Sequence, residues 1–300
     1  MLAKCSNVRL TLVAALVSAS GAAQALTITP VTDPATAAAT LFAAAQAPSS
    51  GITLQPGASY QGNTSTPQSG TYTGFTLAPS SGSTPTLVLP NGVFLTSGTA
   101  DIPMTNTVNA FSVNPASGSN AALTTLSGTN TNDANVISAS FTVAPGNNAV
   151  TATFVFGTDE FPTQSVTDIF GFFVDGVNYA KFPSGELISN TPGNPTNFIL
   201  NPVGAGLYPI EFNGLTQVFQ VTGLLDASLS VHTITIGIAD TSDTIFDSGV
   251  FLGGLQATVA TNGGGIGQPG GPPSGVPEPA SLALVGLGLA GLGLRQRRRA

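Results

Sequence analysis

Residues 137–156 read ISASFTVAPGNNAVTATFVF and give the clearest secondary-structure signal in this chain of 300 residues. In 137–143 and again in 150–156, apolar side chains alternate with serine and threonine, which predicts strands that bury one face. The Pro-Gly-Asn-Asn segment between them, residues 145–148, is typical of a turn. The stretch therefore predicts a hairpin of two half-buried antiparallel strands.

The same texture continues on both sides of this hairpin, and a helix is expected only near the start. Residues 35–46 are rich in alanine, with Thr32 or Asp33 as N-cap and Pro34 in the first turn, so they predict a short helix. Further strands are expected at residues 71–77, 86–96, 169–174, 177–182, 216–222, 230–239 and 250–259. Many short strands with Gly, Pro and Asn turns predict a mainly β fold, an antiparallel β-sandwich of the jelly-roll type.

The amino-terminal end is typical of a secretory signal peptide covering residues 1–25. Lys4 and Arg9 form a basic region, residues 10–20 an apolar one, and Ala23-Gln24-Ala25 a cleavage site of small residues for signal peptidase. The only cysteine, Cys5, lies inside the removed segment. The mature chain is therefore expected to have no thiol, no disulfide and no cysteine-bound metal.

The carboxyl-terminal end has three parts in a fixed order. A Pro-Glu-Pro tripeptide is followed by the uncharged apolar run 280–294 and then by arginines, which keep the far end of such a segment on the cytoplasmic side. Residues 276–294 are long enough to cross about 30 Å of hydrocarbon as a single transmembrane helix. The residues that define the tail are Pro277, Glu278, Pro279, Arg295, Arg297, Arg298 and Arg299.

This tail resembles the PEP-CTERM sorting signal of bacterial envelope proteins. The resemblance implies that an integral-membrane enzyme, exosortase, recognises the tail, cleaves near the Pro-Glu-Pro and releases or transfers the mature protein. The protein would then be exported, held transiently in the inner membrane, and delivered to the cell surface or the extracellular space. A permanent membrane anchor is the alternative, but a simple anchor has no use for a fixed tripeptide.

The charge of the chain is very uneven. Outside the two targeting ends, residues 26–275 contain 13 acidic residues and one basic residue, Lys181. A net charge of 13 − 1 = 12 negative predicts an acidic surface that repels nucleic acid and anionic lipid. Cations are its natural small partners, although such a surface equally keeps a secreted protein soluble. Residues 262–275, NGGGIGQPGGPPSG, are expected to be a linker between one domain, 26–261, and the tail at 276–300.

The body of the chain resembles the choice-of-anchor L domain, a secreted all-β module whose members carry alternative C-terminal sorting or anchoring signals. The resemblance spans residues 32–259 and rests on 51–52, 59–62, 92–98, 154–162, 168–173, 211–216 and 232–252. Thr158-Asp159-Glu160-Phe161 replaces the usual Ser-Glu-Glu-Tyr, and Thr167 stands where Asn commonly precedes Asp168. Both departures keep a paired carboxylate. The resemblance implies the fold and the location of the protein and no established activity.

Two groups of acidic residues are candidate calcium ligands. Asp240, Asp243 and Asp247 lie between two expected strands, and Asp159, Glu160 and Asp168 flank a turn. Three carboxylates in a tight loop need a cation or a proton, because nearby like charges raise each other's pKa. Calcium accepts six to eight oxygen ligands. The alternative is that these side chains only stabilise turns, as Asp commonly does.

No catalytic residue and no organic cofactor is expected. Asp159 and Glu160 are adjacent in the sequence and point to opposite faces of a strand, and the chain has no Trp to bind sugar rings. No nucleophile elbow or paired histidines occur. His232 alternates with isoleucines and is expected to be buried at the margin of a sheet. The segment Asn63-Thr64-Ser65 is a formal glycosylation sequon that is expected to be a polar loop.

Together these observations predict an exported, exosortase-sorted cell-surface or extracellular-matrix protein that is not an enzyme. Its expected role is structural or adhesive, with signal peptidase, an exosortase-like enzyme and exopolysaccharide or biofilm components as partners and with no nucleic acid. The alternatives are a calcium- or carbohydrate-binding module and a polysaccharide-active hydrolase.

Overall fold

The computed structural model describes residues 25–82, 84–164, 168–189, 195–204, 206–261 and 263–267. This part of the chain is mainly antiparallel β, with two α-helices, α1 (Ala37–Ala45) and α2 (Ala121–Ser127), and a 3-10 helix (Pro195–Asn197). The expected signal helix, the expected transmembrane helix and the residues of the sorting tail lie outside the described residues. Within those residues no helix has the length and apolarity to cross a membrane.

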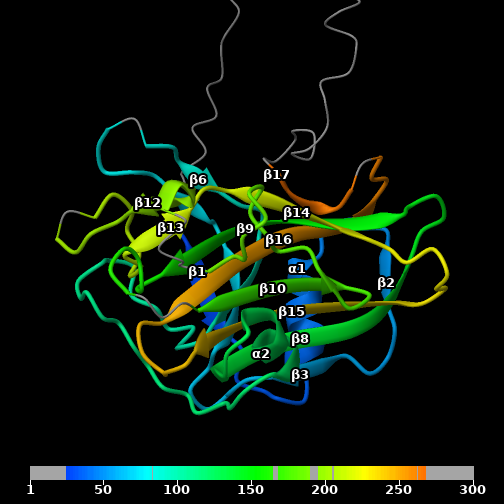
Figure 1. Ribbon diagram of the computed structural model, residues 1–300, viewed down its shortest axis with the longest axis horizontal. Coiled ribbons are helices and arrows are strands. Elements are labelled where there is room, and N and C mark those ends of the chain that lie inside the picture. The colour runs from blue at the N-terminus through cyan, green and yellow to red at the C-terminus, as the bar shows by residue number, and fades with distance from the viewer. Residues whose placement is uncertain are drawn as a thin grey trace, which may run out of the picture.

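The strands form two large sheets and a small one (Figure 1). The larger sheet contains β1 (Thr27–Pro30), β4 (Ser69–Thr73), β7 (Gly92–Thr96), β9 (Ala149–Thr158), β12 (Phe198–Leu200), β13 (Gly214–Thr216), β14 (Phe219–Leu224), β16 (Ser248–Thr258) and β17 (Gly265–Gly267). The smaller sheet contains β2 (Ile52–Leu54), β3 (Ser59–Gln61), β8 (Thr131–Val143), β10 (Ile169–Val174), β11 (Val177–Asn178) and β15 (His232–Thr241). Strands β5 (Thr76–Leu77) and β6 (Leu87–Val88) pair separately.

The pairing of the central strands is that of a jelly roll. Along the chain, β7 pairs with β16, β8 with β15, β9 with β14, and β10 with β11, each pair antiparallel. Successive strands thus pair from the outside inward, as in one long hairpin that has been rolled into two sheets. Figure 1 shows β9, β14 and β16 above β10, β15 and β8. The antiparallel sandwich that the sequence predicted is confirmed.

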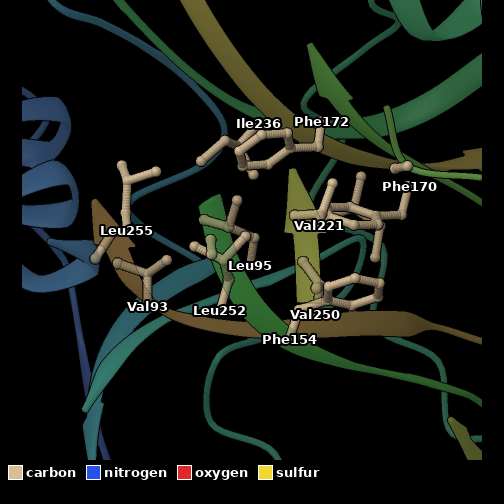
Figure 2. Close-up of a cluster of buried hydrophobic side chains, with 14 of the residues drawn as sticks. Val93, Leu95, Phe154, Phe170, Phe172, Val221, Ile236, Val250, Leu252 and Leu255 are labelled. Atoms are coloured by element: carbon tan, nitrogen blue, oxygen red, sulfur yellow. The ribbon is translucent and has the colours of Figure 1, made fainter. Parts of the chain in front are cut away.

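The main core lies between the two sheets and is closed by α1. Figure 2 shows Phe172 and Ile236 from the smaller sheet facing side chains of the larger sheet such as Leu95 and Val250. Phe42 of α1 is fully buried in the same core. The expected strand alternation produces this layer because inward positions recur at every second residue.

The outer faces of both sheets are also partly covered, so several strands are apolar on both faces. Phe94, Val155 and Phe251 point away from the main core into a second cluster beneath loops. On the other sheet Leu123 of α2 covers Ile169. Continuous apolar runs such as Val93 to Leu95 follow from this double burial.

The helices differ from the prediction in two respects. Helix α1 begins at Ala37 instead of residue 35, because the preceding residues form a turn in which Asp33 accepts a hydrogen bond from the Ala35 N–H. Helix α2 was not predicted, although Asn120 as N-cap and Gly128 in the left-handed conformation are standard helix ends. Leu123 is its only buried residue, so it shows no apolar periodicity.

Several predicted strand ends also move. The expected strand 216–222 is two strands, β13 and β14, and β11 ends at Asn178 instead of residue 182. The expected linker begins too early, since β17 pairs with β14 and buries Ile266. Ile266 is the only large apolar side chain of residues 262–275, and its burial extends the domain to Gly267.

The N-cap of α2 gives a first prediction. The Asn120 side-chain oxygen accepts hydrogen bonds from Ala122 N–H (3.0 Å) and Leu123 N–H (3.2 Å). We expect Asn120→Ala to lower the free energy of unfolding by about 1 kcal/mol in urea titrations, because two helix N–H groups lose their acceptor. Asn120→Asp keeps the acceptor and should retain most of the stability. Equal losses in the two variants would show that the cap contributes nothing.

Candidate functional site: a buried acidic cluster

One end of the jelly-roll interior is polar. On β7 the inward positions Val93 and Leu95 are followed by Ser97, and on β16 Ser248 precedes Val250. The two serines are buried, and Ser97 N–H donates to the Ser248 carbonyl at 3.0 Å. Because β7 and β16 are antiparallel, the inward-facing residue at the end of β7 lies beside the inward-facing residue at the beginning of β16. The hydroxyls therefore lie at the same end of the larger sheet.

The smaller sheet places two carboxyls at this end. Strand β10 pairs with β15 so that Ile169 lies opposite Ala239, which brings the flanking residues Asp168 and Asp240 side by side. Both aspartates are 0% exposed. The pairing of β15 with β8 shifts in register between Ile238 and Asp240, just where β15 enters this region. The acidic pair thus lies inside the sandwich, on the inward faces of β10 and β15, whose other inward side chains include Phe and Ile.

Acidic residues are unusually abundant inside this domain. Seven of the 13 acids in residues 26–275 are buried: Asp133, Asp159, Glu160, Asp168, Glu211, Asp240 and Asp247. The only Lys or Arg in the described part of the chain is Lys181, and it is exposed. The prediction of a strongly acidic surface is therefore wrong for about half of the negative charge. That charge lies inside, and no basic side chain among the described residues neutralises it.

Three of the buried acids hold loops through backbone hydrogen bonds. Glu211 accepts from the N–H groups of Thr107 and Val108, with a shortest distance of 2.9 Å. Asp159 accepts from Phe111 N–H and Asn213 N–H. Glu160 accepts from Asp168 N–H at 3.0 Å. These bonds satisfy backbone N–H groups that would otherwise be buried without an acceptor, so the three acids have a structural role.

Each of the other four buried acids keeps at least one side-chain oxygen without a hydrogen-bond partner. Within the described residues, the buried side-chain oxygens near this end that make no hydrogen bond of regular geometry are Asp133 Oδ2, both Oδ atoms of Asp168, both Oδ atoms of Asp240, Asp247 Oδ1 and Ser248 Oγ. Ser248 is near enough to Asp168, and Ser97 to Asp240, to oppose part of the rise in their pKa. Buried polar atoms are nearly always paired in folded proteins, because an unpaired one loses its hydration without compensation. The gathering of so many at one end therefore requires an explanation.

Burial raises the pKa of every acid in this cluster. It is the largest cause of the raised pKa of Asp168, to which the charges of Asp240 and Glu160 add. Burial also raises the pKa of Asp240 to about 7, and those of Glu160 and Asp247 to about 9. Asp159 reaches a pKa of about 8 for the same reason. The cluster cannot carry all its charges at neutral pH without a proton or a cation to balance them.

The structure brings all six predicted acids within electrostatic reach of at least one other: besides burial, the charges of Asp243 and Asp240 raise the pKa of Glu160, those of Asp240 and Glu160 raise that of Asp168, and those of Asp240 and Asp159 raise that of Asp247. Asp243 is half-buried on a turn, where its side chain accepts a bond from Ile245 N–H as in an Asx-turn. The carboxyl of Asp159 instead binds the Phe111 and Asn213 N–H groups. In the described part of the chain, no group of three or more His, Cys, Asp or Glu side chains is already arranged to hold a metal ion.

Three polar residues of the cluster were not predicted. Ser97 and Ser248 continue the alternation of the expected strands 86–96 and 250–259 by one step, so the pattern could have identified them. Asp133 lies in a positive-φ position (47°) of β8, and no sequence pattern places it there. Elsewhere, His232 is buried at the end of β15 as expected, with Nδ1 2.8 Å from Asp175 Oδ2.

Comparisons with known proteins place the chain in a family. The model of the choice-of-anchor L domain matches residues 58–256, and that of the PEP-CTERM protein-sorting motif matches residues 275–299. No curated protein and no solved structure matches the chain. A motif of this kind marks an exported protein with a C-terminal membrane anchor that an exosortase-type membrane enzyme processes. With well over half of its length matched, the chain belongs to the choice-of-anchor L domain family and is an exported, exosortase-sorted surface protein.

Proposed function

We propose that this protein is a structural or adhesive component of the cell surface or extracellular matrix, where it contacts exopolysaccharide. The observation that carries the proposal is the sorting motif at residues 275–299, which follows a β-sandwich domain whose last described strand ends at Gly267. The chain thus combines a delivery signal with a β domain that needs no further partner to bury its core. The predicted signal peptide at residues 1–25 supplies the other half of this route.

The closed site supports a non-enzymatic role. A glycosidase needs two carboxyls facing each other across a cleft that admits the sugar. Asp168 and Asp240 are fully buried, and Asp159 and Glu160 bind different loop N–H groups. The described cavities are lined by other residues, such as Lys181 with Phe182 and Gln46 with Gly51. The many Ser, Thr and Asn side chains of the chain are suited to binding a hydrated polysaccharide at the surface and not to hydrolysing it.

The delivery route gives a second prediction. In cells that contain an exosortase, the mature protein should be recovered outside the inner membrane, with an intact mass that lacks residues 1–25 and the tail beyond Pro277–Pro279. Replacing Pro277, Glu278 and Pro279 by alanine should leave most of the protein in the membrane with its arginines retained. Glu186→Ala changes a partly exposed acid of the β domain and should be sorted normally. Recovery of wild-type protein in the membrane with Arg295–Arg299 intact would establish a permanent anchor.

The matrix role is tested separately from sorting. Purified mature protein should cosediment with exopolysaccharide from the same cells, and a deletion strain should yield less cell-bound matrix. A release of reducing sugar from that polysaccharide would favour the hydrolase alternative. The proposed contact would be contradicted if the protein did not cosediment with the polysaccharide and the deletion strain kept an unchanged amount of matrix.

A further inference from the structure

The unpartnered oxygens at the acidic end of the jelly roll have one common feature: they are all hard, anionic or hydroxyl donors. We propose that Asp168 and Asp240 bind one calcium ion between them, with the Ser248 hydroxyl as a further ligand. Asp168 and Asp240 offer four unpartnered oxygens and Ser248 one, and water would supply the remaining ligands. Calcium takes six to eight oxygens at 2.3–2.6 Å. This inference goes beyond the matrix role and does not depend on it.

The strands that carry these ligands come from both sheets. Asp168 and Asp240 belong to the ends of β10 and β15 in the smaller sheet, and Ser248 begins β16 in the larger one. Ser97 Oγ accepts from Ser248 N–H at 3.0 Å and orients this residue from β7. An ion at this point therefore joins the two layers of the sandwich. Its charge also replaces the basic side chains that this end lacks.

Asp247 is already held on one side. Its Oδ2 accepts from Val113 N–H at 2.8 Å, whereas Oδ1 has no partner. The charge of Asp240 acts on Asp247, so the two carboxyls are within electrostatic reach of each other. Because adjacent residues of a strand point to opposite faces, the side chains of Asp247 and Ser248 leave β16 on opposite sides, and Asp247 acts on the pair through its charge instead of as a ligand. The protein ligands are thus the two aspartates and the Ser248 hydroxyl, and no third acid of the described residues has to converge on the ion.

The chemistry of the donors selects the type of cation. All the unpartnered atoms at this end are oxygens, whereas zinc and copper prefer imidazole and thiolate ligands. Magnesium demands a regular octahedron at 2.0–2.1 Å and retains several waters. A buried, irregular group of carboxylates suits the larger and more tolerant calcium ion. An exported protein also meets calcium outside the cell.

The test uses the mature protein freed of metal with EGTA. Calcium chloride should raise the thermal midpoint, Tm, by about 5 °C or more once its concentration is 100-fold above the dissociation constant. Calorimetry in two buffers of different ionisation enthalpy should show that calcium binding releases protons. Magnesium at the same concentrations should give less than half the shift. An unchanged Tm together with no binding heat for calcium would overturn the proposal, and an equal response to magnesium would overturn the assignment to calcium.

Two variants locate the ion. Asp168→Asn and Asp240→Asn keep the size of each side chain and remove its charge, so the Tm in EGTA should be equal or higher while the calcium shift disappears. Asp226→Asn is the control, because Asp226 is exposed beyond the end of β14, at the opposite end of the sandwich. A full calcium shift in both Asn variants would place the ion elsewhere. If a variant fails to fold, the wild-type titration against EGTA still decides the proposal.

Discussion

We expect the Tm of the calcium-free domain to fall as the pH is raised from 5 to 9. Burial holds the pKa of Asp240 near 7 and those of Glu160 and Asp247 near 9, above the ordinary range of free carboxyls. For such groups the folded state binds more protons than the unfolded state, so stability is fully present below the unfolded pKa of about 4. It is lost as the pH rises from there through the folded pKa values. The direction is opposite to that of a protein with salt-bridged carboxylates.

The size of this effect follows from proton linkage. For one carboxyl that is protonated in the folded state and ionised in the unfolded state, the free energy of unfolding falls by about 1.4 kcal/mol per pH unit. Asp240 alone would then remove about 4 kcal/mol between pH 4 and pH 7, and its neighbours continue the loss toward pH 9. A domain typically has only 5–15 kcal/mol of stability. We therefore expect the Tm in EGTA to fall by about 10 °C or more over this range.

Differential scanning calorimetry at fixed ionic strength measures the profile. Asp240→Asn should flatten it, because the group with a pKa near 7 is removed. The exposed-site variant Asp226→Asn should follow the wild type. A Tm that stays constant or rises from pH 5 to pH 9 in EGTA would show that these carboxyls are ionised in the folded domain.

The second large effect is expected from Gly92→Ala. Gly92 lies in β7 opposite Gly253 of β16, in the middle of the larger sheet. A β-carbon at this position would overlap the Leu252 carbonyl oxygen and lie 2.8 Å from the Gly253 α-carbon. These are backbone atoms, so they can move only if the pairing of β7 with β16 opens. We expect a loss of about 3 kcal/mol or more in the free energy of unfolding.

Urea unfolding and the yield of soluble protein measure this loss. Gly263→Ala provides a matched control, since a β-carbon there meets no atom within 4 Å and its backbone is not in the left-handed region. It should remain within about 0.5 kcal/mol of the wild type. Equal stability of the two variants would mean that the two central strands separate more easily than their pairing indicates.

The strands that alternate cleanly were the most predictable part of the fold. The pattern in 150–156 gives the inward face of β9 directly, and β10 has the predicted ends. Helix α2 was missed because it buries one leucine against a sheet that is apolar on both faces. A pattern along one segment carries no information about what covers its outer face, so tertiary contacts decided this element.

The sequence identified most of the acids of the cluster, but it did not predict which of them lie next to each other or that they are buried. Asp168 and Asp240 lie next to two predicted strands, 169–174 and 230–239, but only the register of Ile169 with Ala239 makes them neighbours. Sequence alone also assigned the negative charge to the surface, because acids are rarely buried without partners. Asp243, which looked equivalent to Asp240, ended on a half-exposed turn.

Strand β17 limits how far the domain can lie from the bilayer while the C-terminal segment anchors it. Because Gly267 is fixed against β14, only the nine residues 268–276 separate the sheet from the Pro-Glu-Pro tripeptide. Fully extended, they span about 30 Å. That gap is narrower than the folded domain itself, whose size corresponds to a radius of gyration of about 18 Å. We therefore expect the sorting enzyme to work close to the folded domain, and we expect that shortening residues 268–276 blocks its access to the tail without altering the recognition sequence.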